Sequence, residues 1–407
     1  GPASHGRVGA RAGLHELRRA VRILERLAQE QLSRLADPAA VATPLALLIT
    51  GWGSWASAFR SGPLAWAEDL VHDLVRDGGR AGITVIISGQ RELVTARFFA
   101  AIPNRVYFPT GSSEESRIAW PKLPPTPSVV GRAVAMGAVS AGKTAVCQFY
   151  TARPETDWTI GGHSQRTTAA NRPFRVEPLP FMVPAAHIFD KADTPRPDGT
   201  PGRRADGVTA RVGQTPGLLR IGVGGDELEP VSVRVPTGAV LAVLGAPGSG
   251  KSALLRLLPA LNPDAGPWLR PQPEAEPSAY WSEVLNRAST GGLDKGSVAL
   301  VDDADLLPYD VNRQLAELNA LGLTVVMTAG FSPTLTQRVP LTLQARNLGT
   351  GVLIAPRTFL DGDLFGVRFE AEPNPPPGRS AVIQNGRALA VQLGWVPPDE
   401  TPQGLAH

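Results

Sequence analysis

One stretch, from Ala239 to Leu261, constrains the fold of this chain more than any other. An apolar run rich in β-branched residues leads into a glycine-rich turn, and a Leu/Ala-rich run with helical spacing follows. The turn matches G-x-x-x-x-G-K-[ST], the phosphate loop that joins a strand to a helix. Glycines let backbone N–H groups approach a polyphosphate, and the helix N-terminus adds its positive dipole end. A chance glycine loop would lack these flanking elements, so the context favours nucleotide binding.

The same motif assigns roles to the residues of the loop. Lys251 would reach the β- and γ-phosphates of a nucleotide, and the Ser252 hydroxyl would ligate Mg²⁺. The predicted cofactors are therefore ATP and Mg²⁺. The residues predicted to bind the nucleotide are Gly245, Gly248, Ser249, Gly250, Lys251 and Ser252.

A second run, further along the chain, has the pattern of a Walker B strand. The apolar residues Val298–Val301 end in Asp302-Asp303. We expect Asp302 to hold Mg²⁺ together with Ser252, and Asp303 to be the catalytic residue that orients the attacking water. ATPases usually place a glutamate there, and a water displaced by about 1 Å can cost on the order of a hundredfold in rate. The alternative is an ordinary turn at the end of a strand.

Composition sets broader limits on the class of protein. The chain has 407 residues, of which 43% are hydrophobic and 19% charged, a globular balance with room for two or three domains. A net charge of +3 is too small to indicate a nucleic-acid or acidic-membrane partner by itself. The only cysteine, Cys147, excludes an internal disulfide and is expected to be buried. No apolar run reaches the roughly 18 residues of a membrane helix.

The first half alternates predicted helices and strands. The pattern predicts an amphipathic helix over Leu14–Leu35 and a second helix over Trp66–Val75. Strands are expected at Leu45–Thr50, Ile83–Gln90 and Arg105–Phe108, with a further helix over residues 97–101 between the last two. This β-α-β-α-β order predicts a parallel, doubly wound sheet.

The first half contains another stretch whose sequence matches the phosphate-loop pattern. Residues 137–144 read GAVSAGKT, which also fits G-x-x-x-x-G-K-[ST]. The residues on both sides alternate like strands, which predicts a β-hairpin and leaves no helix N-terminus for an anion. We therefore interpret Lys143 as a solvated strand residue.

Matching motif order suggests that the chain is a tandem duplication of one module. The sequence predicts a degenerate module over residues 1–165, a Pro/Gly-rich linker over 166–216, and a complete phosphate-loop module over 217–407. The expected fold class is α/β, with mainly parallel central sheets flanked by helices.

The first half also carries a family resemblance. IPNRVYFPTGSSEESRIAW (Ile102–Trp120) and IISGQRE (Ile86–Glu92) are similar to segments of the FtsK/SpoIIIE motor family. With the tandem layout, the chain most resembles the C-terminal modules of the type VII secretion ATPases (EccC), which have RecA-like P-loop NTPase folds. The resemblance covers nearly the whole chain.

The resemblance implies several functional properties. An active module elsewhere in the polypeptide hydrolyses ATP, while these later modules bind nucleotide weakly, regulate the motor and contact secreted protein substrates. Family motors assemble as hexameric rings, and Arg105 and Arg117 match the family arginines that reach a neighbour's nucleotide. Surface salt bridges are the alternative role for both. The resemblance also implies a cytoplasmic location, with a tether to the inner face of the cell membrane outside this sequence.

This sequence departs from the family at several positions. Thr50-Gly51 stands where the first module should carry its Walker B carboxylates, and the phosphate loop of that module is not found. In the second half, Gly330-Phe331 replaces the Gln90-Arg91 pair of the sensor strand. We therefore expect weak or no intrinsic hydrolysis. Two alternatives remain open, a double-stranded DNA translocase and a scaffold that binds nucleotide only for stability.

Overall fold

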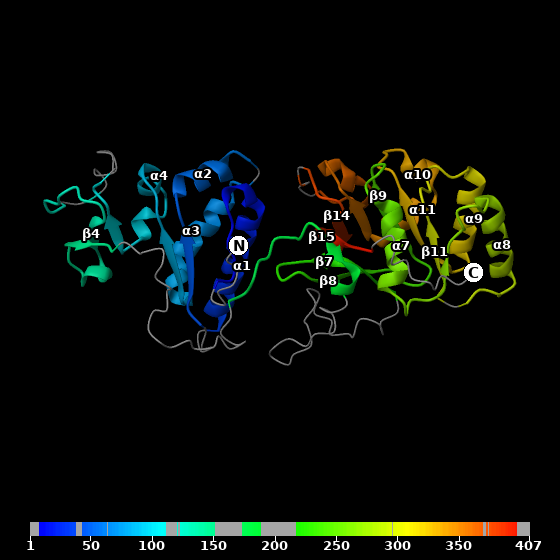
Figure 1. The fold of residues 1–407 in the computed structure, drawn as a ribbon, viewed down its shortest axis with the longest axis horizontal. Coiled ribbons are helices and arrows are strands. Elements are labelled where there is room, and N and C mark those ends of the chain that lie inside the picture. The colour runs from blue at the N-terminus through cyan, green and yellow to red at the C-terminus, as the bar shows by residue number, and fades with distance from the viewer. Residues whose placement is uncertain are drawn as a thin grey trace. The chain divides into compact units, whose positions relative to one another are not determined.

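The computed structural model describes residues 8–37, 43–62, 64–110, 120, 123–150, 173–188, 217–294, 296–368, 372 and 374–396. The chain divides into two compact units, Gly1–Val176 (unit 1) and Glu177–His407 (unit 2), which Figure 1 colours from blue to cyan and from green to red. The division into 1–165, 166–216 and 217–407 stays a prediction. Within the described residues, no helix combines the length and the apolar character needed to cross a membrane.

Unit 1 is built around two parallel strands with helices packed on one face. Strands β1 and β2 pair in register from Leu45 opposite Ile83 to Ile49 opposite Ile87. Apolar side chains of α1, α2 and α3 form one buried core with Ile83. On the other face of the pair, Leu48 and Ile86 are 66% and 55% exposed. The elements are η1 (Leu14–Glu16), α1 (Leu17–Ala36), β1 (Leu45–Ile49), α2 (Trp52–Arg60), α3 (Ala67–Asp77), η2 (Gly78–Ala81), β2 (Ile83–Ile87), α4 (Arg91–Val94) and η3 (Phe99–Ala101).

The third predicted strand forms, but the prediction that it pairs in parallel within a doubly wound sheet is wrong. Strand β3 (Arg105–Tyr107) pairs antiparallel with β4 (Arg132–Met136), in a sheet separate from β1 and β2. Its side chains alternate, with Val106 exposed and Tyr107 buried. Alternation is typical of an antiparallel strand with one solvated face, whereas a buried parallel strand has a continuous apolar run.

The hairpin predicted over the second phosphate-loop-like stretch is confirmed. Strand β4 pairs antiparallel with β5 (Ala145–Gln148), and the turn between them contains the 3₁₀ segment η4 (Ala138–Ser140). Lys143 is exposed, as expected, but it lies in the turn before β5 and not in a strand. Cys147, expected to be buried, is only partly so, and its Sγ lies 3.6 Å from the carbonyl oxygen of Ala133.

Unit 2 contains one ten-stranded mixed sheet. Strands β10, β11, β12, β9 and β13 follow one another in parallel, and β14, β15, β7 and β8 continue the sheet antiparallel. The α/β class is therefore confirmed, but the sheet is mixed rather than mainly parallel. The elements are β6 (Val183–Pro184, paired with β15), β7 (Leu218–Gly224), β8 (Glu229–Arg234), β9 (Val240–Gly245), α7 (Lys251–Leu261), β10 (Trp268–Leu269), α8 (Pro277–Ser289), β11 (Val298–Val301), α9 (Tyr309–Ala320), β12 (Thr324–Ala329), α10 (Leu335–Arg338), α11 (Leu341–Leu348), β13 (Gly351–Ile354), η6 (Phe359–Phe365), β14 (Arg379–Gln384) and β15 (Arg387–Trp395).

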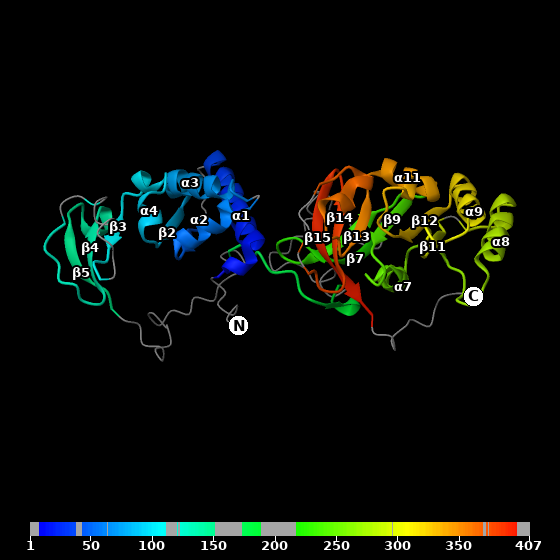
Figure 2. The ribbon, with the colours of Figure 1, turned by 90° about the horizontal axis from the view of Figure 1, so that it is seen from above.

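Helices cover both faces of the parallel part of this sheet. In Figure 2, α11 lies on one side of the sheet and α7 on the other. Alternate residues of β9, β11 and β12 therefore enter two cores, one packed against α8, α9 and α11 and the other against α7. Every residue of these three strands is buried. Burial on both faces explains their continuous apolar runs.

A buried asparagine connects the end of α7 to an irregular point of strand β7. The register of β7 with β8 shifts between Arg220 and Gly222. Asn262 Oδ1 accepts a hydrogen bond from the Arg220 N–H at 2.7 Å, and Asn262 Nδ2 donates to the carbonyl oxygens of Arg220 at 3.1 Å and Leu258 at 2.8 Å. The amide thus makes three hydrogen bonds to backbone groups in a buried environment, where the loss of such bonds is costly.

We predict that Asn262→Ala lowers the free energy of unfolding of unit 2 by about 2–4 kcal/mol, because it removes three hydrogen bonds to buried backbone groups. Urea denaturation measures the change. The control is Asn286→Ala, at an exposed position of α8, which should change stability by less than about 0.5 kcal/mol. Equal effects of the two substitutions would contradict the assignment.

Candidate nucleotide-binding site

The predicted phosphate loop lies between β9 and α7, with the backbone that its glycines require. Gly248 and Gly250 have φ angles of +74° and +106°, and Gly250 is the residue that precedes the helix. A Cβ at either position would meet no atom within 4 Å, so backbone conformation rather than space requires glycine there. At Gly245, a Cβ would lie 2.3 Å from Ser249 Oγ, so close packing is the requirement.

The loop also contains a buried hydroxyl without a partner. Ser249 Oγ is inaccessible to solvent and makes no hydrogen bond. Buried polar atoms are nearly always satisfied, and exceptions occur where a ligand is expected. Together with the N-terminus of the eleven-residue helix α7, this donor fits a phosphate group.

Lys251 is held inside the loop by three acceptors. Its Nζ donates to the carbonyl oxygens of Gly245 at 3.2 Å and Ala246 at 3.3 Å, and lies 3.2 Å from Asp303 Oδ1. The lysine side chain is 8% exposed and that of Asp303 is 41% exposed. The cation predicted to meet phosphate is therefore paired with the predicted catalytic carboxylate.

The order of the parallel strands brings the predicted residues together. Strand β12 lies between β9 and β11, so Gly245 at the end of β9 and Asp302 after β11 meet at one edge of the sheet. Ligands of open α/β sheets bind at such carboxyl ends. The structure therefore brings together the loop and the Asp302-Asp303 pair that sequence separates.

Thr328 of β12 organises this edge, and sequence reasoning missed it. The Thr328 hydroxyl donates to Asp302 Oδ1 at 2.7 Å and accepts a hydrogen bond from the Asp303 N–H at 2.7 Å. The residue is fully buried. The replacement of the sensor pair by Gly330-Phe331 concerns other positions, and Thr328 keeps a hydroxyl on this strand. A polar residue within the apolar run VVMTA was the available signal.

The same hydrogen bonds recur in unit 1. Gly51 N–H donates to Ser88 Oγ at 3.3 Å, and Trp52 N–H donates to the Ser88 carbonyl at 2.9 Å. In unit 2, Ala304 N–H donates to the Thr328 carbonyl at 2.8 Å. Gly51 and Asp303 also share a left-handed backbone, with φ of +68° and +42°.

This correspondence supports the predicted duplication at the level of single hydrogen bonds. It places Thr50 and Gly51 of unit 1 where unit 2 has Asp302 and Asp303. Unit 1 therefore keeps the backbone of the Walker B end without its carboxylates.

The predicted metal site depends on few protein ligands. Among the described residues, no three His, Cys, Asp or Glu side chains cluster as a metal site. Mg²⁺ in nucleotide sites is held by one or two side chains with water and substrate phosphates. A Mg²⁺ site on the Ser252 hydroxyl and the Asp302 carboxylate stays a prediction.

Of the two arginines predicted from the family resemblance, the structure describes only Arg105. Arg105 donates to the carbonyl oxygens of Ile102 at 2.9 Å and Phe99 at 3.0 Å, and its guanidinium lies 4.3 Å from the centre of the Phe99 ring. These contacts are internal to unit 1, and a role towards a neighbouring subunit stays a prediction. Arg117 lies outside the described residues.

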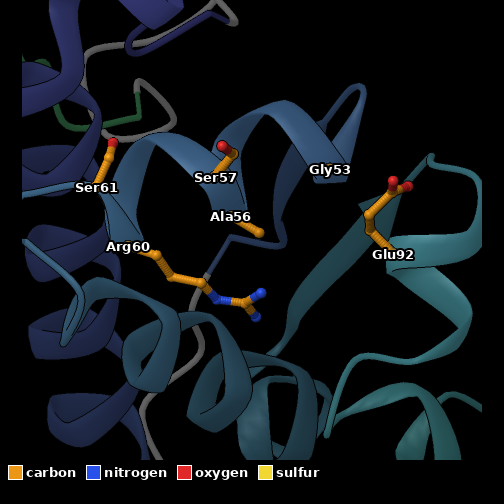
Figure 3. Close-up of a pocket in the computed structure, with 6 residues that line it drawn as sticks. All are labelled: Gly53, Ala56, Ser57, Arg60, Ser61 and Glu92. Carbon is orange, nitrogen blue, oxygen red and sulfur yellow. The ribbon is translucent and has the colours of Figure 1, made fainter.

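A separate hollow of about 460 Å³ lies in unit 1 between α2 and α4 (Figure 3). Arg60 contributes its only cation, and two hydrogen bonds of 2.6 and 2.8 Å tie that guanidinium to the Glu68 carboxylate. The lining residues are Gly53, Ala56, Ser57, Arg60, Ser61 and Glu92. None of the predicted site residues lines it.

Strand order and the strand–loop–helix segment from β9 to α7 give unit 2 an α/β fold with a mixed sheet. A scan against protein-family models found no match to the chain. A search of solved structures found chains with a similar fold.

One is EssC (ATPases 2 and 3) from Geobacillus thermodenitrificans, with a TM-score of 0.60 and 13% identity, over 94% of this chain and 80% of that chain. Another is Thermomonospora curvata EccC (ATPases 2 and 3) in complex with a signal sequence peptide, with a TM-score of 0.52 and 17% identity, over 96% of this chain and 79% of that chain. This chain is thus structurally similar, over nearly its whole length, to ATPase modules 2 and 3 of these proteins. At such identities the similarity shows the fold.

We predict that Thr328→Val lowers the free energy of unfolding of unit 2 by about 1–3 kcal/mol, since an isosteric apolar residue leaves the Asp303 N–H unpaired. Thr328→Ser should recover most of the loss. The matched variant in unit 1, Ser88→Ala, removes the equivalent acceptor at an exposed position and should cost less. Denaturant unfolding of the four proteins tests the order, and an effect of Ser88→Ala as large as that of Thr328→Val would contradict it.

Proposed function

We propose that unit 2 binds ATP with Mg²⁺ as a regulatory module of a type VII secretion ATPase. The observation that carries this proposal is the meeting of the phosphate loop with Asp302 and Thr328 at one sheet edge. The buried, unpartnered Ser249 hydroxyl adds a donor suited to phosphate. The two-module similarity to EssC and EccC supports the choice of system.

Each residue of the site has a role in this proposal. The loop N–H groups between Gly245 and Lys251 bind the phosphates, and the Lys251 ammonium neutralises their charge. Ser252 and Asp302 hold Mg²⁺, which neutralises charge that develops on the phosphates. Thr328 fixes the orientation of the Asp302 carboxylate through its 2.7 Å hydrogen bond.

We expect hydrolysis to be weak or absent. Asp303 is one methylene shorter than the glutamate usually found there, and its carboxylate is engaged with Lys251. A water held out of line loses much of the benefit of positioning. Unit 1 offers neither carboxylate, since Thr50 and Gly51 occupy those positions.

The wider role concerns the partners of the motor. We propose that the pair of modules recognises a secreted protein substrate, since the similar EccC structure was determined with a signal sequence peptide. The other expected partners are further modules of the same polypeptide and neighbouring copies in a hexameric ring. A cytoplasmic location with a membrane tether outside this sequence belongs to the same proposal.

We predict that the chain binds Mg-ATP in calorimetry and that Lys251→Ala abolishes binding, because the charge that offsets the phosphates is lost. Lys143→Ala, at the motif-like stretch of unit 1, should leave affinity unchanged. Phosphate release followed in parallel should stay near background. Binding that survives Lys251→Ala would refute the assignment of the site. Lys251-dependent phosphate release would refute weak hydrolysis and make Asp303 a working catalytic residue.

The DNA translocase alternative makes an opposite prediction. A net charge of +3 gives little capacity to neutralise phosphates, so we expect no double-stranded DNA binding at 0.15 M salt, a condition at which several contacts would be needed. Filter binding at varied salt measures this. A steep dependence of affinity on salt would favour the translocase over the secretion motor.

A further inference from the structure

The contact between Lys251 and Asp303 changes what the phosphate loop offers to an anion. A lysine ammonium has three N–H donors. In unit 2, the carbonyl oxygens of Gly245 and Ala246 and the carboxylate of Asp303 lie at 3.2, 3.3 and 3.2 Å from it. Two of the donors form hydrogen bonds, and the Asp303 carboxylate offsets the charge of the ammonium. A phosphate group therefore meets a lysine that already has an anionic partner.

The backbone of Asp303 sets the position of that carboxylate. Its φ of +42° lies in the left-handed region, which non-glycine residues rarely adopt. The Asp303 N–H is held by Thr328 Oγ1 at 2.7 Å, and its carbonyl oxygen accepts from the Leu306 N–H at 2.8 Å. The carboxylate is thus directed towards α7 by a conformation that the surroundings maintain.

Unit 1 shows that this conformation does not need the carboxylate. Gly51 adopts the same left-handed backbone and the equivalent hydrogen bond to Ser88. The side chain of Asp303 is therefore dispensable for the local fold, and its contact with Lys251 calls for a separate role.

We propose that Asp303 competes with the nucleotide phosphate for Lys251 and thereby limits the affinity of unit 2 for ATP. This inference deepens the proposed function and rests on it. Asp303 leaves Lys251 when a triphosphate binds, and returns when the nucleotide dissociates. A residue in the position of a catalytic carboxylate thus sets nucleotide affinity.

The test is ATP binding measured by calorimetry without Mg²⁺, on the complete chain and three variants. Asp303→Asn removes the charge, and asparagine tolerates a left-handed backbone. Asp303→Gly removes the side chain and installs the residue that adopts this backbone conformation at Gly51 of unit 1. Asp264→Asn, in an exposed turn after α7, makes the same change of charge away from Lys251.

We expect both Asp303 variants to bind ATP about tenfold more tightly, the order expected when one partly buried ion pair no longer competes. Asp264→Asn should stay within about twofold of the native chain, since exposed charges at a distance are screened. Equal or weaker binding by both Asp303 variants would overturn the competition while leaving the proposed function intact. If no protein binds ATP, both proposals are overturned.

A second measurement tests the contact without any nucleotide. In a double-mutant cycle, Asp303→Asn should lower the urea midpoint of the native chain but not that of a Lys251→Met background. Additive effects of the two substitutions would show that the side chains do not interact, and would overturn the competition independently of any binding assay.

Discussion

The parallel pairing of β9, β12 and β11 is the constraint on which the candidate site depends. It brings the end of the phosphate-loop strand, Thr328 and the Asp302-Asp303 pair to one edge of the sheet. The strands are buried on both faces, so their register is fixed by two cores at once. The polar residues at the ends of these strands are therefore held in place by the apolar cores and not by their own interactions.

Much of this arrangement follows from the sequence, because its strongest signals are local. The phosphate loop and the strand β11 were predicted from continuous apolar stretches that end in glycine or aspartate. The predictions that failed concerned features that depend on contacts between residues far apart in the sequence. Helix α2 was missed because GWGSW has the composition of a loop, whereas burial of Trp52 and Phe59, at 1% and 2% exposure, stabilises it as a helix. Three residues of β3 could not indicate the direction of their partner.

Thr328 illustrates a further limit of sequence reasoning. Threonine is common in strands because its β-branched side chain packs well there, so its place in the apolar run VVMTA marks a polar residue but not its partners. Its role becomes visible only when Asp302 and Asp303, which lie 26 and 25 residues away along the chain, are placed beside its hydroxyl. Buried hydroxyls that satisfy two groups at once are costly to replace.

Gly51 and Asp303 share a left-handed backbone, in which a residue that carries a carboxylate is more strained than glycine. A left-handed residue with a side chain costs roughly 1 kcal/mol that glycine does not incur. Replacing aspartate by glycine at such a position therefore has two effects: it relieves backbone strain and it removes a carboxylate. After a duplication, a copy that is no longer selected for turnover can lose its catalytic group with a gain in stability. At Asp303 the same replacement would free the backbone of that cost, so the carboxylate is present despite the strain that it brings.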